Sequence, residues 1–155
     1  MSKHSVLDNK THIDLRIDAG FGPELGDAVM ACLTVPDAFR QVQAAFPILF
    51  RRDNADGRFS ALALVGFENG ENLFLENGTW DAAYRPLALS VQPFLIGRNS
   101  DGSAGGQVHV DMEHPRISRT GDGVRVFDES GQATPYLEDI AEKLGRLDQG
   151  YRASE

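Results

Sequence analysis

The stretch from residue 45 to residue 80 constrains the fold of this chain more than any other. It contains the longest apolar run (residues 60–67), a turn with an Asn69-Gly70 pair, a second apolar run (residues 72–75) and the single tryptophan, Trp80. Asn-Gly pairs favour positive φ angles and tight turns between antiparallel strands. The stretch therefore predicts a β-hairpin in the core, and it carries no recognisable catalytic signature.

The rest of the chain supplies short strands and helical segments. Apolar and polar residues alternate over residues 12–18, which is typical of a half-buried strand. One helix is expected over residues 37–46, and another over residues 134–147, where Thr134-Pro135 begins the first turn. Because strands and helices do not alternate regularly, the sequence predicts a single α+β domain over residues 1–155, with a mainly antiparallel β-sheet and two or three helices. Further strands are expected over residues 28–35, 48–50, 93–96, 108–112, 116–118 and 123–127.

Two segments have compositions that favour flexibility. Residues 1–10 are polar, and we expect them to be frayed. Residues 98–107 are rich in glycine and serine, which is typical of a flexible loop. Neither segment is expected to contribute to the core.

The chain is acidic, because 15 Lys+Arg against 23 Asp+Glu give a net charge of -8. Arg51-Arg52 is the nearest approach to a basic patch, and Asp53 and Asp56 offset it. A nucleic-acid surface needs local positive charge, so nucleic acid is not an expected partner. No stretch has the roughly 18 consecutive apolar residues of a membrane span, and the N-terminus lacks an apolar signal segment. A cytoplasmic protein is therefore expected.

Cys32 is the single cysteine, which excludes an intrachain disulfide and a cysteine-based zinc cluster. Its neighbours are apolar, so the sequence predicts a buried thiol rather than a nucleophile. Neither a G-x-S-x-G motif nor a phosphate-binding loop is present. These patterns do not favour an enzyme.

His109 and Asp111 form a His-x-Asp pair within an expected strand. Side chains two residues apart on a strand point to the same face, and such a pair begins the facial triad of non-haem iron oxygenases. His114 and His12 are candidates for a further ligand. No histidine follows His114, although a facial triad normally takes its second histidine from further downstream. The segment with His109, Asp111 and His114 is therefore interpreted as a solvated polar loop, with a metal site as the alternative.

Trp80, Tyr84 and Arg85 lie in a polar, loop-like stretch. Aromatic rings beside a cation can line a ligand groove, whereas Phe74 and Phe94 lie in apolar runs that indicate core packing. Trp80, Tyr84 and Arg85 are therefore the candidate ligand-binding residues. No cofactor is predicted.

A series of short segments, taken in order and with their spacing, resembles the SapC family of bacterial proteins, first associated with surface-layer protein loci. The resemblance covers most of residues 12 to 145. The segments are HIDLR (12–16), FPILF (46–50), ALVGF (63–67), ENLF (71–74), GTW (78–80), YRP (84–86), PF (93–94), FDESG (127–131) and TP (134–135).

The resemblance implies no established enzyme activity, cofactor or catalytic residue. Family members tend to be encoded near flavin-dependent halogenase-like proteins, cupin-type oxygenase-like proteins and outer-membrane receptors. This setting implies an accessory role in envelope-related processing or uptake of a peptide or glycan. Typical members continue past the helix at residues 136–147 into a further α-rich segment, so this chain resembles a short or truncated member. We therefore expect an apolar face that is either exposed or used for self-association, such as a homodimer through the C-terminal helix.

Two functional hypotheses follow. The first is a non-enzymatic accessory or binding protein that acts with a partner protein or a small peptide or glycan ligand. The second is a metal-dependent enzyme that uses the His109-x-Asp111 pair.

Overall fold

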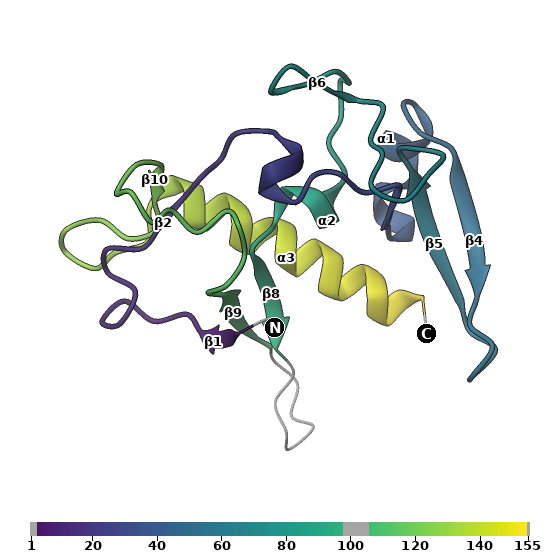
Figure 1. Ribbon diagram of the computed structural model, residues 1–155. Helices are drawn as coiled ribbons and strands as arrows, with labels where there is room; N and C mark the ends of the chain where they lie inside the picture. Colours follow the sequence, from purple (N-terminus) through teal and green to yellow (C-terminus); the bar gives the residue numbers. More distant parts are fainter. Residues whose placement is uncertain (1–2, 98–105, 155) are drawn as a thin grey trace. The chain divides into compact units, whose positions relative to one another are not determined.

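The computed structural model describes residues 3–97 and 106–154 (Figure 1). The chain divides into two compact units. Unit 1 consists of Met1–Ala19 and Val91–Leu144, and unit 2 of Gly20–Ser90 and Gly145–Glu155. The described residues form three α-helices, and every strand pairing among them is antiparallel. This confirms the predicted α+β class, with the strands distributed among small sheets.

Unit 2 is built around a three-stranded sheet in the order β3-β5-β4. Its central strand, β5 (Phe59–Leu64), pairs with β3 (Ala31–Leu33) and with β4 (Ile48–Arg52). One face of this sheet buries Cys32 and Ala63, which lie opposite each other in the register. The other elements of unit 2 are η1 (Pro23–Leu25), η2 (Pro36–Ala38), α1 (Phe39–Gln43), β6 (Leu75–Glu76), β7 (Thr79–Trp80), α2 (Leu87–Ser90) and the end of α3 (Pro135–Ala153).

The hairpin predicted at Asn69-Gly70 is wrong, because the strand before this turn pairs with β3 and β4 instead of with the strand after it. The Glu71 carboxylate accepts the Phe67 backbone N–H at 2.7 Å, so a side chain closes the turn in place of a strand ladder. An Asn-Gly hairpin does form at Asn77-Gly78, between β6 and β7. Both of its turn residues have positive φ, at 50° and 75°, as a two-residue hairpin turn requires.

Unit 1 contains a three-stranded sheet in the order β1-β9-β8 and a two-stranded sheet that pairs β10 with β2. Residues 4–6 form β1 where the sequence predicted a frayed end, because β9 supplies a partner strand far along the chain. Most of the predicted flexible loop, residues 98–105, lies outside the described residues, and β9 begins at Gln107. The strands are β1 (His4–Val6), β2 (Arg16–Ile17), β8 (Phe94–Gly97), β9 (Gln107–Asp111) and β10 (Val124–Arg125).

The long helix α3 begins where Thr134-Pro135 predicted it. The Thr134 hydroxyl accepts the Leu137 backbone N–H at 3.5 Å and donates to the Arg125 carbonyl at 2.7 Å. Apolar side chains at three- and four-residue spacing form a stripe on α3, and most of them are buried, with Ile140 only 1% exposed. These buried side chains are used inside the chain, and a homodimer through α3 stays a prediction. The buried members of the stripe are Leu137, Ile140, Leu144 and Leu147.

Candidate functional site

Trp80 is half-buried at the end of β7 in unit 2, where it packs against other aromatic rings. Its ring centroid lies 6.1 Å from those of both Phe46 and Phe74, which are themselves 4.7 Å apart in an edge-to-face contact. Its indole N–H donates to the Tyr84 carbonyl at 2.9 Å. Both the apolar body and the polar tip of Trp80 are therefore used inside unit 2.

Arg85 is held by an ion pair that sequence reasoning missed. Its Nη2 lies 2.8 Å from Oδ1 of Asp27, a side chain with no solvent exposure. The guanidinium also lies over the Phe21 ring at 4.8 Å and near the Trp80 ring at 6.0 Å, both within cation–π range. Asp27 lies in a glycine-rich turn 58 residues earlier in the chain, and no local pattern pairs it with Arg85.

Tyr84 completes the predicted set. Its hydroxyl oxygen is buried and has no hydrogen-bond partner among the described residues. Burial raises the pKa of this hydroxyl, an effect that the positive charge of Arg146 opposes. The structure thus brings Trp80, Tyr84 and Arg85 together, with the aromatic and charged groups of Trp80 and Arg85 engaged in contacts that stabilise unit 2.

The predicted metal ligands are not arranged around a common point. The His109 ring lies over Gly97, where an added Cβ would overlap it. Asp111 Oδ1 instead accepts the backbone N–H groups of Lys3 and Glu113, at 2.9 and 3.1 Å. His114 Nδ1 accepts the Arg116 backbone N–H at 3.2 Å. Within residues 3–97 and 106–154, no group of three His, Cys, Asp or Glu side chains could hold a metal ion.

Hydrogen bonds from the protein backbone determine the environment of the Asp111 carboxylate. Burial acts to raise its pKa, but the hydrogen bonds from the Lys3 and Glu113 amides outweigh this effect, and the net shift is downward. A carboxylate that accepts backbone amides is stabilised in its charged form. Asp111 therefore joins β1 to the turn after β9, and the metal-enzyme hypothesis gains no support.

Cys32 lies on the buried face of the sheet in unit 2, as its apolar neighbours predicted. Burial raises the pKa of its thiol to about 12.

We therefore expect an aromatic disulfide reagent at about pH 8 to modify the native protein only as fast as it unfolds, and to modify the urea-unfolded chain at once. Rapid native modification, followed by thiolate release, would contradict this placement. The contribution of the protonated thiol to stability should be present below pH 9 and be lost as pH rises towards 12.

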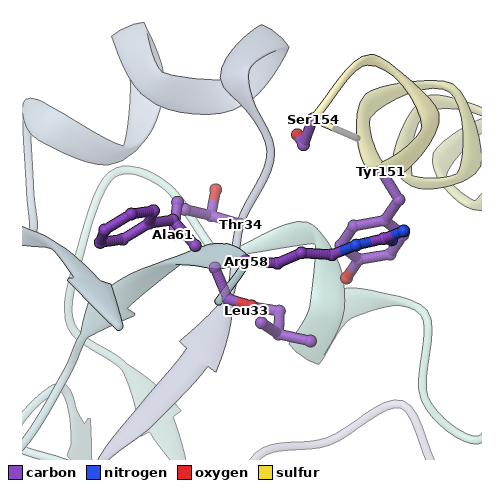
Figure 2. A pocket seen from close by; sticks show the side chains of 8 residues that line it. Leu33, Thr34, Arg58, Ala61, Tyr151 and Ser154 are labelled. Carbon is purple, nitrogen blue, oxygen red and sulfur yellow. The ribbon is translucent and has the colours of Figure 1, made fainter. Parts of the chain in front are cut away.

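A pocket of about 180 Å³ lies beside this sheet in unit 2. Figure 2 shows the side chains of Arg58 and Tyr151 directed into it, with Leu33 and Ala61 on the strands. Ligand pockets for small organic molecules span roughly 300–1,000 Å³, so this volume suits a few water molecules better. Burial raises the pKa of the Tyr151 hydroxyl, which stays neutral near pH 7.

A larger groove, of about 430 Å³, lies in unit 1 between β1, β9 and α3. Its lining is mostly apolar and includes Val6, Phe127 and Leu137. Gln107 and Glu138 provide polar groups. A specific small-molecule site needs several convergent polar groups, so this lining does not define a ligand.

The other side of the unit 2 sheet carries a row of apolar side chains, two of which are exposed. Leu33, Leu62 and Leu49 occupy one row of the register across β3, β5 and β4, and we call them the leucine row. Directly opposite residues point to the same face of a sheet. Leu33 is 40% exposed and Leu49 is 49% exposed. Sequence periodicity could not identify this row, because the apolar run over residues 60–67 is assigned as a whole to the core.

Comparison with known proteins supports the family resemblance. No helix among residues 3–97 and 106–154 is long and apolar enough to cross a bilayer. No curated protein and no solved structure matches the chain significantly. The sequence does match the model of the SapC family over residues 7–155, which is nearly its whole length. The chain therefore belongs to the SapC family.

Proposed function

We propose that this SapC family member is a non-enzymatic accessory protein that binds a partner protein through the leucine row of unit 2. The observation that carries the proposal is the exposure of Leu33 and Leu49 in one row across a three-stranded sheet. An exposed contiguous apolar surface is typical of a protein-interaction site, since exposing it to water is unfavourable.

The contacts of the other candidate residues favour the same conclusion. Arg85 neutralises the buried Asp27, and Trp80 packs against Phe46 and Phe74, so these groups are used within the protein. The family resemblance suggests that the partner takes part in envelope-related processing or uptake of a peptide or glycan. The accessory protein would then act on that process through its partner rather than by its own chemistry.

The test is affinity purification with the wild-type chain and two matched variants. Leu49→Glu places a charge in the leucine row, whereas Val124→Glu places one on an exposed valine of β10 in unit 1. We expect wild type and Val124→Glu to retain the same protein from a lysate of the source cells. Leu49→Glu should retain at least about tenfold less, which corresponds to a loss of about 1.4 kcal/mol.

Both variants change exposed residues, so thermal unfolding should show that each is folded. Equal retention by Leu49→Glu and wild type, or no protein retained specifically by wild type, would contradict the proposed function.

A further inference from the structure

The open edge of the unit 2 sheet lies beside the leucine row. β4 is the edge strand of the order β3-β5-β4, and among the described residues it pairs with β5 and with no other strand (Figure 1). Both of its faces are accessible, since Leu49 is 49% exposed and Phe50 is 63% exposed. An accessible edge strand with apolar side chains is a template for pairing with another chain.

The hydrogen bonds at the two ends of β4 show which backbone groups face outward. Leu64 N–H donates to the Pro47 carbonyl at 3.0 Å, and Asp53 N–H donates to the Arg58 carbonyl at 2.7 Å. Hydrogen-bonded pairs alternate along an antiparallel ladder, so residues 49 and 51 also bond towards β5. The N–H and C=O groups of Ile48, Phe50 and Arg52 therefore point away from the sheet.

The charges along this edge select the kind of partner. Arg51 and Arg52 are exposed and form no ion pair within the described residues. The nearby carboxylates are engaged locally, because Asp53 accepts the Ala55 N–H at 2.8 Å. Asp56 accepts the Arg58 N–H at 3.0 Å and pairs with its guanidinium at 3.5 Å. Neither the Arg51 nor the Arg52 guanidinium is therefore held in an ion pair among the described residues, and the expectation that Asp53 and Asp56 offset their charge stays a prediction.

A second copy that paired through its own β4 would bring two more arginines to the same edge. An acidic segment would instead form charge-assisted hydrogen bonds with Arg51 and Arg52. We infer that β4 accepts an extended segment of a partner protein, added as an antiparallel strand. In this segment, acidic residues face Arg52 and Arg51, and an aliphatic residue extends the leucine row beside Leu49. The inference rests on the proposed function and specifies the chemistry of its partner.

The probe is a blocked synthetic peptide with the sequence Asp-Glu-Thr-Val-Thr, titrated into isotope-labelled full-length protein and followed by NMR. In the antiparallel register its acidic residues oppose Arg52 and Arg51, and its valine opposes Leu49. We expect the largest amide shifts at Ile48, Phe50 and Arg52, whose N–H groups face outward. Methylation of the peptide nitrogen opposite Phe50 should weaken binding at least about tenfold, because it removes a ladder hydrogen bond.

Two further arms test the charge. Arg52→Glu should weaken peptide binding at least about tenfold, whereas Arg40→Glu, an exposed arginine of α1, should leave it unchanged. A peptide with two lysines in place of the acidic pair should bind at least about tenfold more weakly.

If the methylated peptide bound as tightly as the unmodified peptide, strand addition would be overturned. If the lysine peptide bound as tightly as the acidic one, recognition of the acidic residues would be overturned. Amide shifts in β4 that depend on protein concentration without peptide would show that a second copy is the occupant, and would also overturn the inference. If the peptide did not bind but Leu49→Glu still retained less of the partner protein, the acidic strand would be rejected as the ligand of β4. The proposed function would then remain in place. Partner retention by Leu49→Glu would reject the proposed function itself.

Discussion

Arg85→Met is expected to lower the free energy of unfolding by about 3–5 kcal/mol, because it removes one partner of a buried ion pair. Asp27 has no solvent exposure, and its Oδ1 lies 2.8 Å from Nη2 of Arg85. Methionine retains much of the apolar stem of arginine but has no charge. The Asp27 carboxylate would then remain buried without its guanidinium, which costs far more than an ordinary lost hydrogen bond.

The matched control is Arg146→Met, also in unit 2. Arg146 pairs with Asp37 at 3.3 Å, but the two side chains are 35% and 67% exposed, so water screens the pair. We expect this variant to lose about 0–1 kcal/mol. Urea unfolding at neutral pH measures both losses. Asp27→Asn combined with Arg85→Met should recover part of the stability lost in Arg85→Met, because no uncompensated charge is then buried.

A loss in Arg85→Met no larger than that in Arg146→Met would show that Asp27 does not depend on Arg85. In that case Arg85 would again be a candidate ligand-binding residue, as the sequence predicted.

Replacing each of two glycines of α3 with alanine is expected to change the stability of the protein in opposite directions. A Cβ at Gly150 would overlap the side chain of Val35, which is fully buried, so Gly150→Ala should destabilise the protein by about 1–3 kcal/mol. A Cβ at Gly145 meets nothing within 4 Å, so Gly145→Ala should stabilise it by about 0.5–1 kcal/mol through helix propensity.

The two substitutions are chemically identical and lie on one helix, so each is the control for the other. Thermal and urea unfolding should show the difference in sign. Val35→Ala should reduce the penalty of Gly150→Ala, because the smaller side chain leaves room for the added methyl group. Stabilisation by Gly150→Ala would contradict the close packing of α3 on Val35.

Local signals in the sequence predicted several elements correctly. Thr134-Pro135 begins α3, and the apolar run at residues 48–50 lies in β4. These signals depend on contacts between near neighbours, such as a cap or a repeating apolar face, so they can be read from a short segment. The Asn-Gly pairs show the limit of such signals. Both Gly70 and Gly78 have positive φ, yet only the pair at Asn77-Gly78 joins two paired strands.

The candidate site depended on contacts that a local pattern does not contain. Trp80, Tyr84 and Arg85 share a polar stretch, and the sequence therefore suggested a ligand groove. The partner of Arg85 comes from a turn 58 residues away, so the sequence could not show that its guanidinium pairs with the buried Asp27. Likewise, His109 and Asp111 have the spacing of metal ligands, but backbone amides from Lys3 and Glu113 occupy the carboxylate.

The α+β class, the start of α3 and membership of the SapC family can be read from the sequence alone, because these properties follow from local chemistry and from the order of short segments. The tertiary structure decided which strands pair and which surfaces remain in contact with water. It placed β5 between β3 and β4, and left the leucine row and the outer edge of β4 exposed. The physical reason is that periodicity specifies the faces of a strand, whereas the choice of neighbour depends on the burial energy of residues far apart in the chain.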